Sequence, residues 1–392
     1  MQPVICSIAR TPIGRFNGGL APLSAMDLGG VAITGALERA GLAGSDVDEV
    51  MFGHVLQAGQ GQIPARQAAV RAGVPMTVPA VTINKVCLSG LTAIQEAANH
   101  VRLGESTFVV AGGMESMTNA PYVLPGAREG YRMGNKEVVD VMTHDGLFCA
   151  FDSCMMGESS DRKNDDLGIG RTEQDAWSAS SHARAAKATE DGTFAREIVS
   201  VPVPQRRGEP INVDSDEGIR TATTQESLGS LRPAFHPGGT ITAGNASQIS
   251  DGAAAVVVAD RAAAEAAGLP IIAEIVGYGQ TAGPDATLHE RPAEALRIAL
   301  KRSSLDVGDL DLVEFNEAFA SVALWSARML GIDDARVNVH GGAVALGHPL
   351  GATGARIVVT LLNALAARGG EFGAAALCGG GGQGDAMIVR MV

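Results

Sequence analysis

Two separate stretches of the chain, 81–113 and 337–380, repeat the same order of sequence patterns. Each starts with a strand-like run, passes through a turn of small residues into a helix-like segment, and ends in an apolar run with paired glycines. The turn holds Cys87 in the first stretch and His348 in the second. This internal repeat predicts two duplicated α/β halves. Halves that face each other would bring both turns near a shared axis, beyond the carboxyl ends of strands, where α/β proteins bind ligands.

Strand-like and helix-like segments alternate on both sides of a long insert, which predicts parallel βαβ units. One helix is marked by a capping-box-like pair, Ser24 and Asp27, and by a stop at Gly41. We expect an N-terminal half, an inserted loop domain and a C-terminal half. Their expected bounds are 1–118 with 250–270, 119–249, and 271–392.

The insert has few regular patterns, apart from one clear helix expected at 171–192. A long irregular insert in a compact protein is usually functional or serves assembly. Its segment 122–139 is long and partly apolar, and an exposed apolar patch often marks an interface. We therefore expect an oligomer, at least a dimer and most simply a homotetramer.

Composition excludes several classes of protein. Hydrophobic residues are 46% and charged residues 19% of 392, which suits large cores and not a disordered chain. A net charge of −13 argues against a nucleic-acid partner. We see neither a secretory signal nor an apolar run of about 18 residues, so we expect no membrane association. Five cysteines without CxxC spacing predict a reduced, cytoplasmic protein without a disulfide framework or zinc ribbon.

The motif NKVCLSG, at 84–90, ends a strand and opens a helix. A thiol at a helix N-terminus is close to backbone N–H groups and to the positive end of the helix dipole. Both favour the thiolate, which is the reactive form. Cys87 is therefore a candidate nucleophile, although a buried small hydrophobic residue is the alternative.

The motif GHPLGATG, at 347–354, places His348 in a glycine-rich turn before a helix. A histidine is the natural general base for a thiol at neutral pH. A capping or surface histidine is the alternative.

A glycine run, CGGGGQG at 378–384, follows an apolar strand and leaves backbone amides free to form an oxyanion hole. It also matches G-x-G-x-x-G, but a strand and not a helix follows it, so we reject dinucleotide binding. Cys378 could be a structural thiol or a second acid/base. A zinc site made of Cys87, His348 and Cys378 is conceivable, but two thiols and an imidazole among glycines suit thioester chemistry better.

Two further motifs contain candidate polar groups. Asn316, in NEAFA at 316–320, could be a simple N-cap or could hold a catalytic water. The segment GNASQISDGAAA, at 244–255, could seat an amide-bearing ligand. Cys149 and Cys154, both in the insert, are interpreted as structural thiols.

Together NKVCLSG, NEAFA, GGAVALGHPLGATG and CGGGGQG resemble the thiolase family in order and spacing, and the resemblance covers essentially the whole chain. It implies a duplicated five-layer αβαβα fold with an inserted loop domain. It also implies an acyltransferase that runs a reversible Claisen condensation and needs no cofactor beyond coenzyme A thioester substrates. The segments GYRMG, MTHDGL, DEGIR and LRPAF resemble the biosynthetic, acetoacetyl-CoA branch.

The resemblance implies a role for each motif residue. Cys87 would take the acyl group, and His348 would deprotonate it and help to bind the thioester oxygen. Asn316 would hold a water in that oxyanion hole. Cys378 would move the proton at the α-carbon of the second substrate. The amides of Cys87 and Gly380 would form the other oxyanion hole.

Further positions match those that line the coenzyme A tunnel of the family. They are Arg220, Ser227, Ala243, Ser247, Ala318 and Phe319. Met155 stands where the family branch often has histidine, near the pantetheine and acyl end. Leu88 and Gln248 also depart from the usual residues.

Three alternatives remain at this point. The first is a longer-chain 3-ketoacyl-CoA thiolase of β-oxidation. The second is a non-catalytic acyl-CoA or lipid carrier, which intact Cys87, His348 and Cys378 argue against. The third is a decarboxylating ketosynthase-like enzyme, but such enzymes use a second histidine where this chain has Cys378.

Overall fold

The computed structural model describes all residues from Met1 to Val392. Nine strands hydrogen-bond in the order β14-β15-β16-β13-β1-β12-β5-β3-β4, and the short β2 (Gly14–Arg15) pairs with β12. In chain order the nine are β1 (Pro3–Arg10), β3 (Glu49–Gly53), β4 (Ala80–Ile83), β5 (Phe108–Ser116), β12 (Ser250–Asp260), β13 (Ala273–Ala282), β14 (Leu312–Phe315), β15 (Phe372–Gly379) and β16 (Gln383–Met391). The N-terminal strands and the C-terminal strands meet only where two residues of β1 pair with β13.

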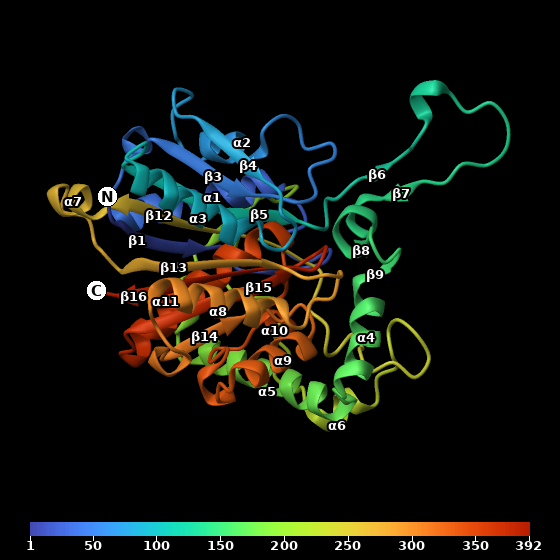
Figure 1. Ribbon diagram of the computed structural model, residues 1–392. Coiled ribbons are helices and arrows are strands. Elements are labelled where there is room, and N and C mark those ends of the chain that lie inside the picture. The colour runs from blue at the N-terminus through green and yellow to red at the C-terminus, as the bar shows by residue number, and fades with distance from the viewer.

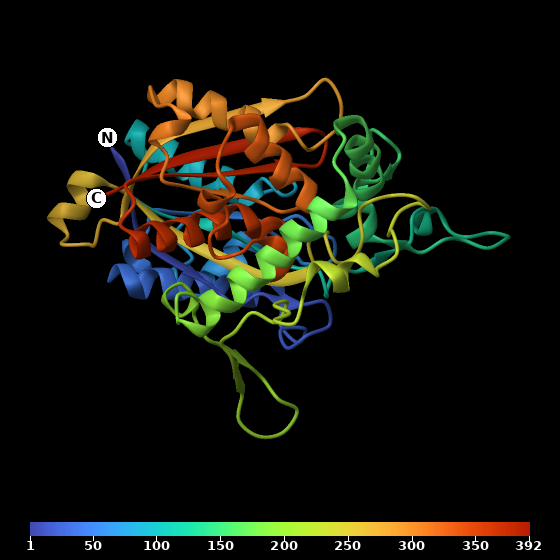
Figure 2. The same cartoon turned by 90° about the horizontal axis from the view of Figure 1, so that it is seen from below.

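The helices form three layers around these strands (Figures 1 and 2). One buried apolar cluster joins the N-terminal strands to an outer layer, a second joins the C-terminal strands to another, and the largest lies between the two groups of strands. The expected five-layer αβαβα order is thus confirmed. The outer layers are α1 (Ala25–Ala40) with α2 (Pro64–Arg71), and α8 (Arg291–Ser303) with α9 (Ala320–Leu330); the central layer is α3 (Ser89–Leu103) with α11 (Leu350–Arg368).

Helix α11 is the one helix long and apolar enough, by length and composition, to cross a membrane. It packs against α3, β5, β12 and β15, and the whole stretch from Leu350 to Leu365 is buried. Its apolar character therefore belongs to the protein core.

Local signals placed the helix ends well. Ser24 accepts a hydrogen bond from Asp27 N at 3.2 Å and its own N–H donates to the Asp27 carboxylate at 3.0 Å, so the expected capping box begins α1. The helix ends at Gly41, whose φ of 74° is the left-handed conformation that glycine adopts without strain.

The sheet is mixed, and the expected parallel units make up only part of it. β3 is parallel to β4 and β5, and β14 is parallel to β15. β12 and β16, however, run antiparallel to all their neighbours on the path. Strands β15 and β16 are joined by the glycine turn 380–382, and so short a connection can only join antiparallel strands.

No strand forms at 337–339 either. Only Val337 makes a bridge, to Val313, because Asn338 adopts a left-handed φ of 46° that ends the extended run. The Asn338 side chain replaces the missing strand, since its Oδ1 accepts from Phe315 N and its Nδ2 donates to Phe315 O, both at 2.8 Å.

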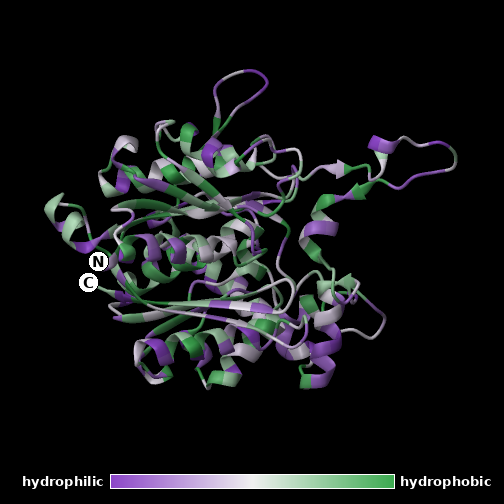
Figure 3. Ribbon diagram, turned by 45° about the horizontal axis from the view of Figure 1, so that its top comes forward, coloured by the Kyte–Doolittle hydropathy of each residue, from purple (hydrophilic) through white to green (hydrophobic).

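The insert contains more regular structure than its sequence indicated, and the helix expected at 171–192 is confirmed as α5 (Arg171–Glu190). A hairpin of β6 (Tyr122–Val123) and β7 (Val139–Asp140) protrudes far from the body (Figure 1). Figure 3 shows hydrophobic ribbon concentrated in the strands, whereas the protruding loops carry much hydrophilic sequence. The other elements of the insert are β8 (Phe148–Cys149), β9 (Cys154–Met155), α4 (Met156–Leu167), β10 (Val201–Val203), β11 (Ile211–Val213) and α6 (Gln225–Gly229).

After the insert, β12 returns to the sheet between β1 and β5, next to the N-terminal strands. The short α7 (Arg261–Ala266) then leads to the C-terminal strands. The domain boundaries at 118, 250 and 271 stay a prediction.

Candidate active site

Cys87 and His348 occupy equivalent places in the two halves. Each lies two residues before the first residue of a central helix, α3 or α11. The N-terminal ends of these helices are in backbone contact: a Cβ on Gly90 would lie 2.8 Å from Ala355 N, and one on Gly354 would lie 2.3 Å from Leu91 N. The glycines therefore allow the approach that brings the two turns together.

A small cavity lies where the turns meet. Its lining residues are Cys87, Leu147, Met156, Ser247, Leu288, Ala318, Phe319, His348, Leu350, Cys378, Gly379 and Gly380. Seven of these are site residues expected from the sequence. Asn316 stands directly behind them, with its Nδ2 3.4 Å from His348 Nε2.

The turn that carries Cys87 is held in an unusual conformation. Val86 has a φ of 51°, which a β-branched residue rarely adopts and which stores strain. Ser89 fixes this turn, because its Oγ accepts from Lys85 N at 2.8 Å and donates to Val86 O at 2.6 Å. The Lys85 ammonium in turn lies 2.8 Å from the buried carboxylate of Asp385 on β16. A strand of the C-terminal half thus anchors the Cys87 turn of the N-terminal half.

Two backbone amides, those of Cys87 itself and of Gly380, lie near the Cys87 sulfur and lower the pKa of its thiol. Burial raises the pKa of the Cys87 thiol to about 12, and these amides oppose that shift without cancelling it. The resting group at neutral pH is therefore a thiol, and an acyl transfer needs a base beside it.

His348 is oriented as such a base. Its Nδ1 lies 2.6 Å from Thr353 Oγ1, and the Thr353 hydroxyl donates its only proton to Pro349 O at 2.9 Å. Thr353 must then accept from His348, so we assign the proton to Nδ1 and a free lone pair to Nε2. Burial lowers the pKa of His348 to about 3, with the charge of Arg356 acting in the same direction, so the imidazole is neutral.

Cys378 and Asn316 complete the polar groups of the cavity. Burial, followed by the proximity of Cys87, raises the pKa of the Cys378 thiol well above its ordinary value. A thiolate at this position would be a strong base. The Asn316 Oδ1 atom is buried without a protein partner, and a water molecule could satisfy it.

Glu317, next to Asn316, connects the motif NEAFA to three other segments. Its buried carboxylate accepts from Trp177 Nε1 at 2.9 Å and from Ser181 Oγ at 2.8 Å, both on α5. It also accepts from Asn338 Nδ2 at 2.9 Å and from Val344 N at 3.0 Å. Val344 lies in the short helix α10 (Ala343–Leu346), which leads directly to His348. One carboxylate therefore fixes both segments that carry Asn316 and His348.

The remaining predicted residues lie outside the cavity. Arg220, Ser227 and Ala243 are exposed, on the irregular segment 218–245. Arg220 is tied to α5 through its backbone N–H, which donates to His182 Nδ1 at 3.1 Å. Burial, followed by the charge of Arg220, lowers the pKa of His182 to about 4, so His182 is neutral and can accept this bond.

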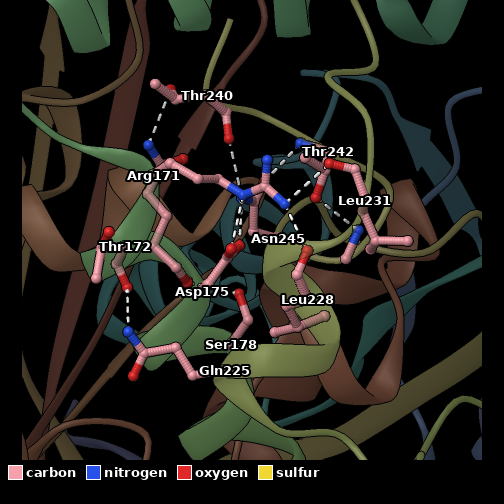
Figure 4. Close-up of polar contacts among 12 residues, drawn as sticks. Arg171, Thr172, Asp175, Ser178, Gln225, Leu228, Leu231, Thr240, Thr242 and Asn245 are labelled. Atoms are coloured by element: carbon pink, nitrogen blue, oxygen red, sulfur yellow. Dashed lines mark hydrogen bonds and ion pairs between the residues drawn. The ribbon is translucent and has the colours of Figure 1, made fainter.

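Helix α5 also holds the rest of this segment (Figure 4). Arg171 donates from Nε to Asp175 Oδ2 at 2.6 Å, and its Nη2 donates to the carbonyl oxygens of Leu228 and Leu231. Asp175 Oδ1 accepts from Asn245 Nδ2 at 3.0 Å. Side chains of α5, rather than sheet hydrogen bonds, therefore position the segment that includes Ser227 and Ala243.

Met155 is half-buried and pairs with Phe148 across β8 and β9, whereas its neighbour Met156 lines the cavity. A place for Met155 beside the acyl group stays a prediction. Sequence reasoning missed Leu147, Met156 and Leu288, because a single apolar residue at the end of a helical segment or in a turn gives no sequence signal of its own.

Two other residues could have been found. Thr353 stands inside the motif GHPLGATG, five residues after the histidine that it orients. Gln248, noted only as a departure from the family, offers its Nε2 to the carbonyl oxygens of Gly218, Val344 and Ala345 at 2.9–3.0 Å. The backbone carbonyl oxygen of Gln248 accepts a hydrogen bond from the backbone N–H of His348 at 3.0 Å. It therefore connects the exposed segment to the histidine turn.

Comparisons with known proteins agree with this geometry. The sequence model "Thiolase, N-terminal domain" matches residues 3–262, and "Thiolase, C-terminal domain" matches residues 269–391. The chain belongs to the thiolase family. The resemblance of its four motifs to that family is thereby confirmed.

Similar thiolases cover the chain from end to end. A "Probable acetyl-CoA acetyltransferase" of Mycolicibacterium smegmatis is 52% identical over 99% of this chain and 100% of its own. An "Acetyl-CoA acetyltransferase" of Escherichia coli is 49% identical over 99% of this chain and 98% of its own. The crystal structure of the Bacillus anthracis acetyl-CoA acetyltransferase matches with a TM-score of 0.97 and 39% identity, over 100% of this chain and 99% of that one.

The zinc alternative has no support in this thiolase. No group of three or more His, Cys, Asp and Glu side chains is placed so that it could hold a metal ion. Cys87, His348 and Cys378 share the cavity as two thiols and a neutral imidazole.

Proposed function

We propose that this thiolase is an acetyl-CoA C-acetyltransferase, which condenses two acetyl-CoA reversibly to acetoacetyl-CoA and coenzyme A. The observation that carries the proposal is the shared cavity of Cys87, His348, Cys378 and Gly380, in a chain about half identical to acetyl-CoA acetyltransferases. A carrier protein would need no such set of reactive groups.

In the first half-reaction, His348 Nε2 takes the proton of Cys87, and the thiolate attacks the acetyl carbonyl carbon. The oxygen of this adduct, which becomes the carbonyl oxygen of acetyl-Cys87, is stabilised by the backbone amides of Cys87 and Gly380. The C–S bond to coenzyme A breaks, and its sulfur takes a proton from Cys378. Acetyl-Cys87 and a Cys378 thiolate remain.

In the second half-reaction, the Cys378 thiolate removes a proton from the methyl group of another acetyl-CoA. The enolate oxygen is held by the Nε2–H group of His348 and by a water on Asn316. The enolate attacks acetyl-Cys87, whose carbonyl oxygen is held by the amides of Cys87 and Gly380. Collapse of this adduct forms acetoacetyl-CoA and releases the Cys87 thiolate, which recovers its proton from His348. Every group returns to its starting protonation state.

The two thiols can be tested separately by mass spectrometry after incubation with acetyl-CoA. We expect acetylation at Cys87 in the wild type and in Cys378→Ala, because the attack needs only Cys87 and His348. Condensation, thiolysis and exchange of methyl protons with deuterated water should fall about 10²–10⁴-fold in Cys378→Ala, since its general base is missing. Cys6→Ala removes a buried thiol of β1 that does not line the cavity, and it serves as the control. Acetylation at another residue, or near-normal condensation by Cys378→Ala, would overturn these assignments.

The cavity favours a short acyl group over the longer chains of β-oxidation. Leu147, Met156, Leu288 and Leu350 line the small cavity together with Cys87. Competition between acetyl-CoA and longer 3-ketoacyl-CoA esters tests this preference, and a preference for the longer esters would contradict it.

Coenzyme A binding is assigned to the exposed segment 218–245 with Ser247, Ala318 and Phe319. Ser247 N donates to Ala318 O at 3.1 Å, which joins this segment to the motif NEAFA at the cavity. Arg220 supplies a positive charge for the phosphates in a chain whose net charge is −13. Met155 and Ala243 belong to the same proposed surface.

We also propose that the protein is a homotetramer in the cytoplasm. The β6–β7 hairpin leaves large apolar side chains in solvent, among them Met133 at 93% and Val138 at 57% exposure. Such exposure on a protruding hairpin favours burial against another copy. A stable monomer in sedimentation at micromolar concentration would contradict this assembly.

A further inference from the structure

Cys149 and Cys154 face each other across the hairpin of β8 and β9. Their registered pairing makes them directly opposed residues of an antiparallel pair. Such residues point to the same face, with Cα atoms about 4.5–5.5 Å apart. Disulfides in proteins span Cα separations of about 4.4–6.8 Å. The paired backbone therefore has the spacing that a disulfide requires.

Both thiols are free and shielded, with residue exposures of 5% and 8%. Cys149 Sγ accepts a hydrogen bond from Asp152 N at 3.4 Å, inside the same hairpin. A two-stranded hairpin by itself is marginally stable. A covalent bond between its two strands would therefore restrict the motion of the hairpin considerably.

This hairpin forms part of the cavity wall. Leu147 directly precedes β8 and Met156 directly follows β9, and both line the cavity with Cys87. Both are only half-buried, so they belong to its outer side. At the tip, the Phe151 ring reaches the glycine turn, since a Cβ on Gly381 would lie 3.0 Å from it. Figure 1 places the hairpin between the protruding β6–β7 arm and α4.

We propose that Cys149 and Cys154 form a reversible disulfide that fixes this wall and restricts the entry of acyl-CoA. The oxidant is a low-molecular-weight disulfide. One cysteine thiolate attacks it and expels one small thiol, and the second cysteine displaces the other small thiol from the mixed disulfide. Two protein thiols are oxidised and one small disulfide is reduced to two thiols, so atoms and electrons balance. The consequence for catalysis rests on the proposed function, whereas formation of the bond does not.

The bond can be detected without any activity. The protein is equilibrated in glutathione buffers of rising oxidised fraction, free thiols are alkylated, and tryptic peptides are weighed. Cleavage after Lys136 and Arg162 releases one peptide that contains both cysteines. We expect this peptide to lose both alkylation sites and two hydrogens as the buffer becomes oxidising. Full alkylation of both cysteines in the most oxidising buffer would overturn the proposal, and so would a bond between Cys87 and Cys378 instead.

The effect on catalysis is measured in the same buffers. We expect kcat/KM for acetyl-CoA to fall roughly threefold or more on oxidation, because a fixed wall cannot open for the substrate. Cys149→Ser and Cys154→Ser should not respond to the buffer, whereas the matched control Cys6→Ala should respond as the wild type does. An equal loss in Cys149→Ser would place the oxidation elsewhere and refute the proposal. A lack of condensation even in reducing buffer would instead refute the proposed function.

Discussion

The catalytic turns and the exposed segment 218–245 are held in different ways. The turns of Cys87 and His348 begin two buried central helices, and their backbones are fixed by glycine contacts and buried side chains. The segment 218–245 has one short helix and is attached to α5 mainly through Arg171, Asp175 and His182. The groups that we propose for bond making therefore lie in the core, whereas those that we propose for coenzyme A binding lie on an exposed segment supported by α5.

The largest effect is expected in the core region. His348→Ala should slow acetylation of Cys87 by about 10²–10⁴-fold, because no other base is aligned with a thiol whose pKa is raised. Single-turnover kinetics with acetyl-CoA measures this rate. His100→Ala, at the far end of α3, is the control and should react normally. Near-normal acetylation by His348→Ala would mean that the base lies elsewhere.

A smaller loss is expected where the core meets α5. Glu317→Gln replaces one of the two acceptor oxygens of the side chain by an NH₂ donor. At least one of the four groups that donate to Glu317 therefore loses its hydrogen-bond acceptor. We expect kcat to fall by on the order of 10–10² with a nearly unchanged KM, because Asn316 and His348 shift together. Steady-state kinetics, with thermal melting to follow folding, measures both. Glu209→Gln, on the exposed β10–β11 loop, is the control. A change in KM alone would place Glu317 with the ligand-binding segment instead.

The exposed segment should show the opposite kinetic pattern. Arg171→Gln frees the carbonyl oxygens at the end of α6, and Arg220→Ala removes the proposed phosphate contact. Both should raise KM for acetyl-CoA by roughly threefold to tenfold while kcat changes less than about twofold, because this binding is remote from bond making. Arg328→Gln, an exposed arginine on α9, is the matched control. A fall in kcat with constant KM would mean that the exposed segment affects catalysis in the same way as the core region does.

The smallest effect is expected from pH. Burial lowers the pKa of His348 to about 3 and raises that of Cys87 to about 12, so neither group changes charge between pH 6 and 9. The acetylation rate should therefore change less than about twofold over this range. Stopped-flow acetylation at constant ionic strength measures it. A tenfold fall per pH unit below 6.5 would show that His348 titrates as an ordinary exposed histidine.

The sequence by itself determined much of this protein. The capping residues of α1, the duplicated strand–turn–helix units and the four motifs could be read directly, because each depends on residues close together in the chain. The expected meeting of the Cys87 and His348 turns followed from the repeat and from the rule that ligands bind at strand ends.

Tertiary structure decided the rest. Lys85 and Asp385 are 300 residues apart, and no local pattern predicts that a strand of one half anchors the Cys87 turn of the other. Glu317 accepts hydrogen bonds from Trp177 and Ser181 on α5, which are 140 and 136 residues away in the chain. The geometry of a short hairpin places Met156, and not Met155, at the cavity. The strand expected at 337–339 does not form, because Asn338 adopts a left-handed backbone conformation and its side chain hydrogen-bonds to β14 instead. These four features have the same physical reason. Local sequence determines the type of an element and where it ends, whereas packing and the need to satisfy buried polar groups determine its distant partners.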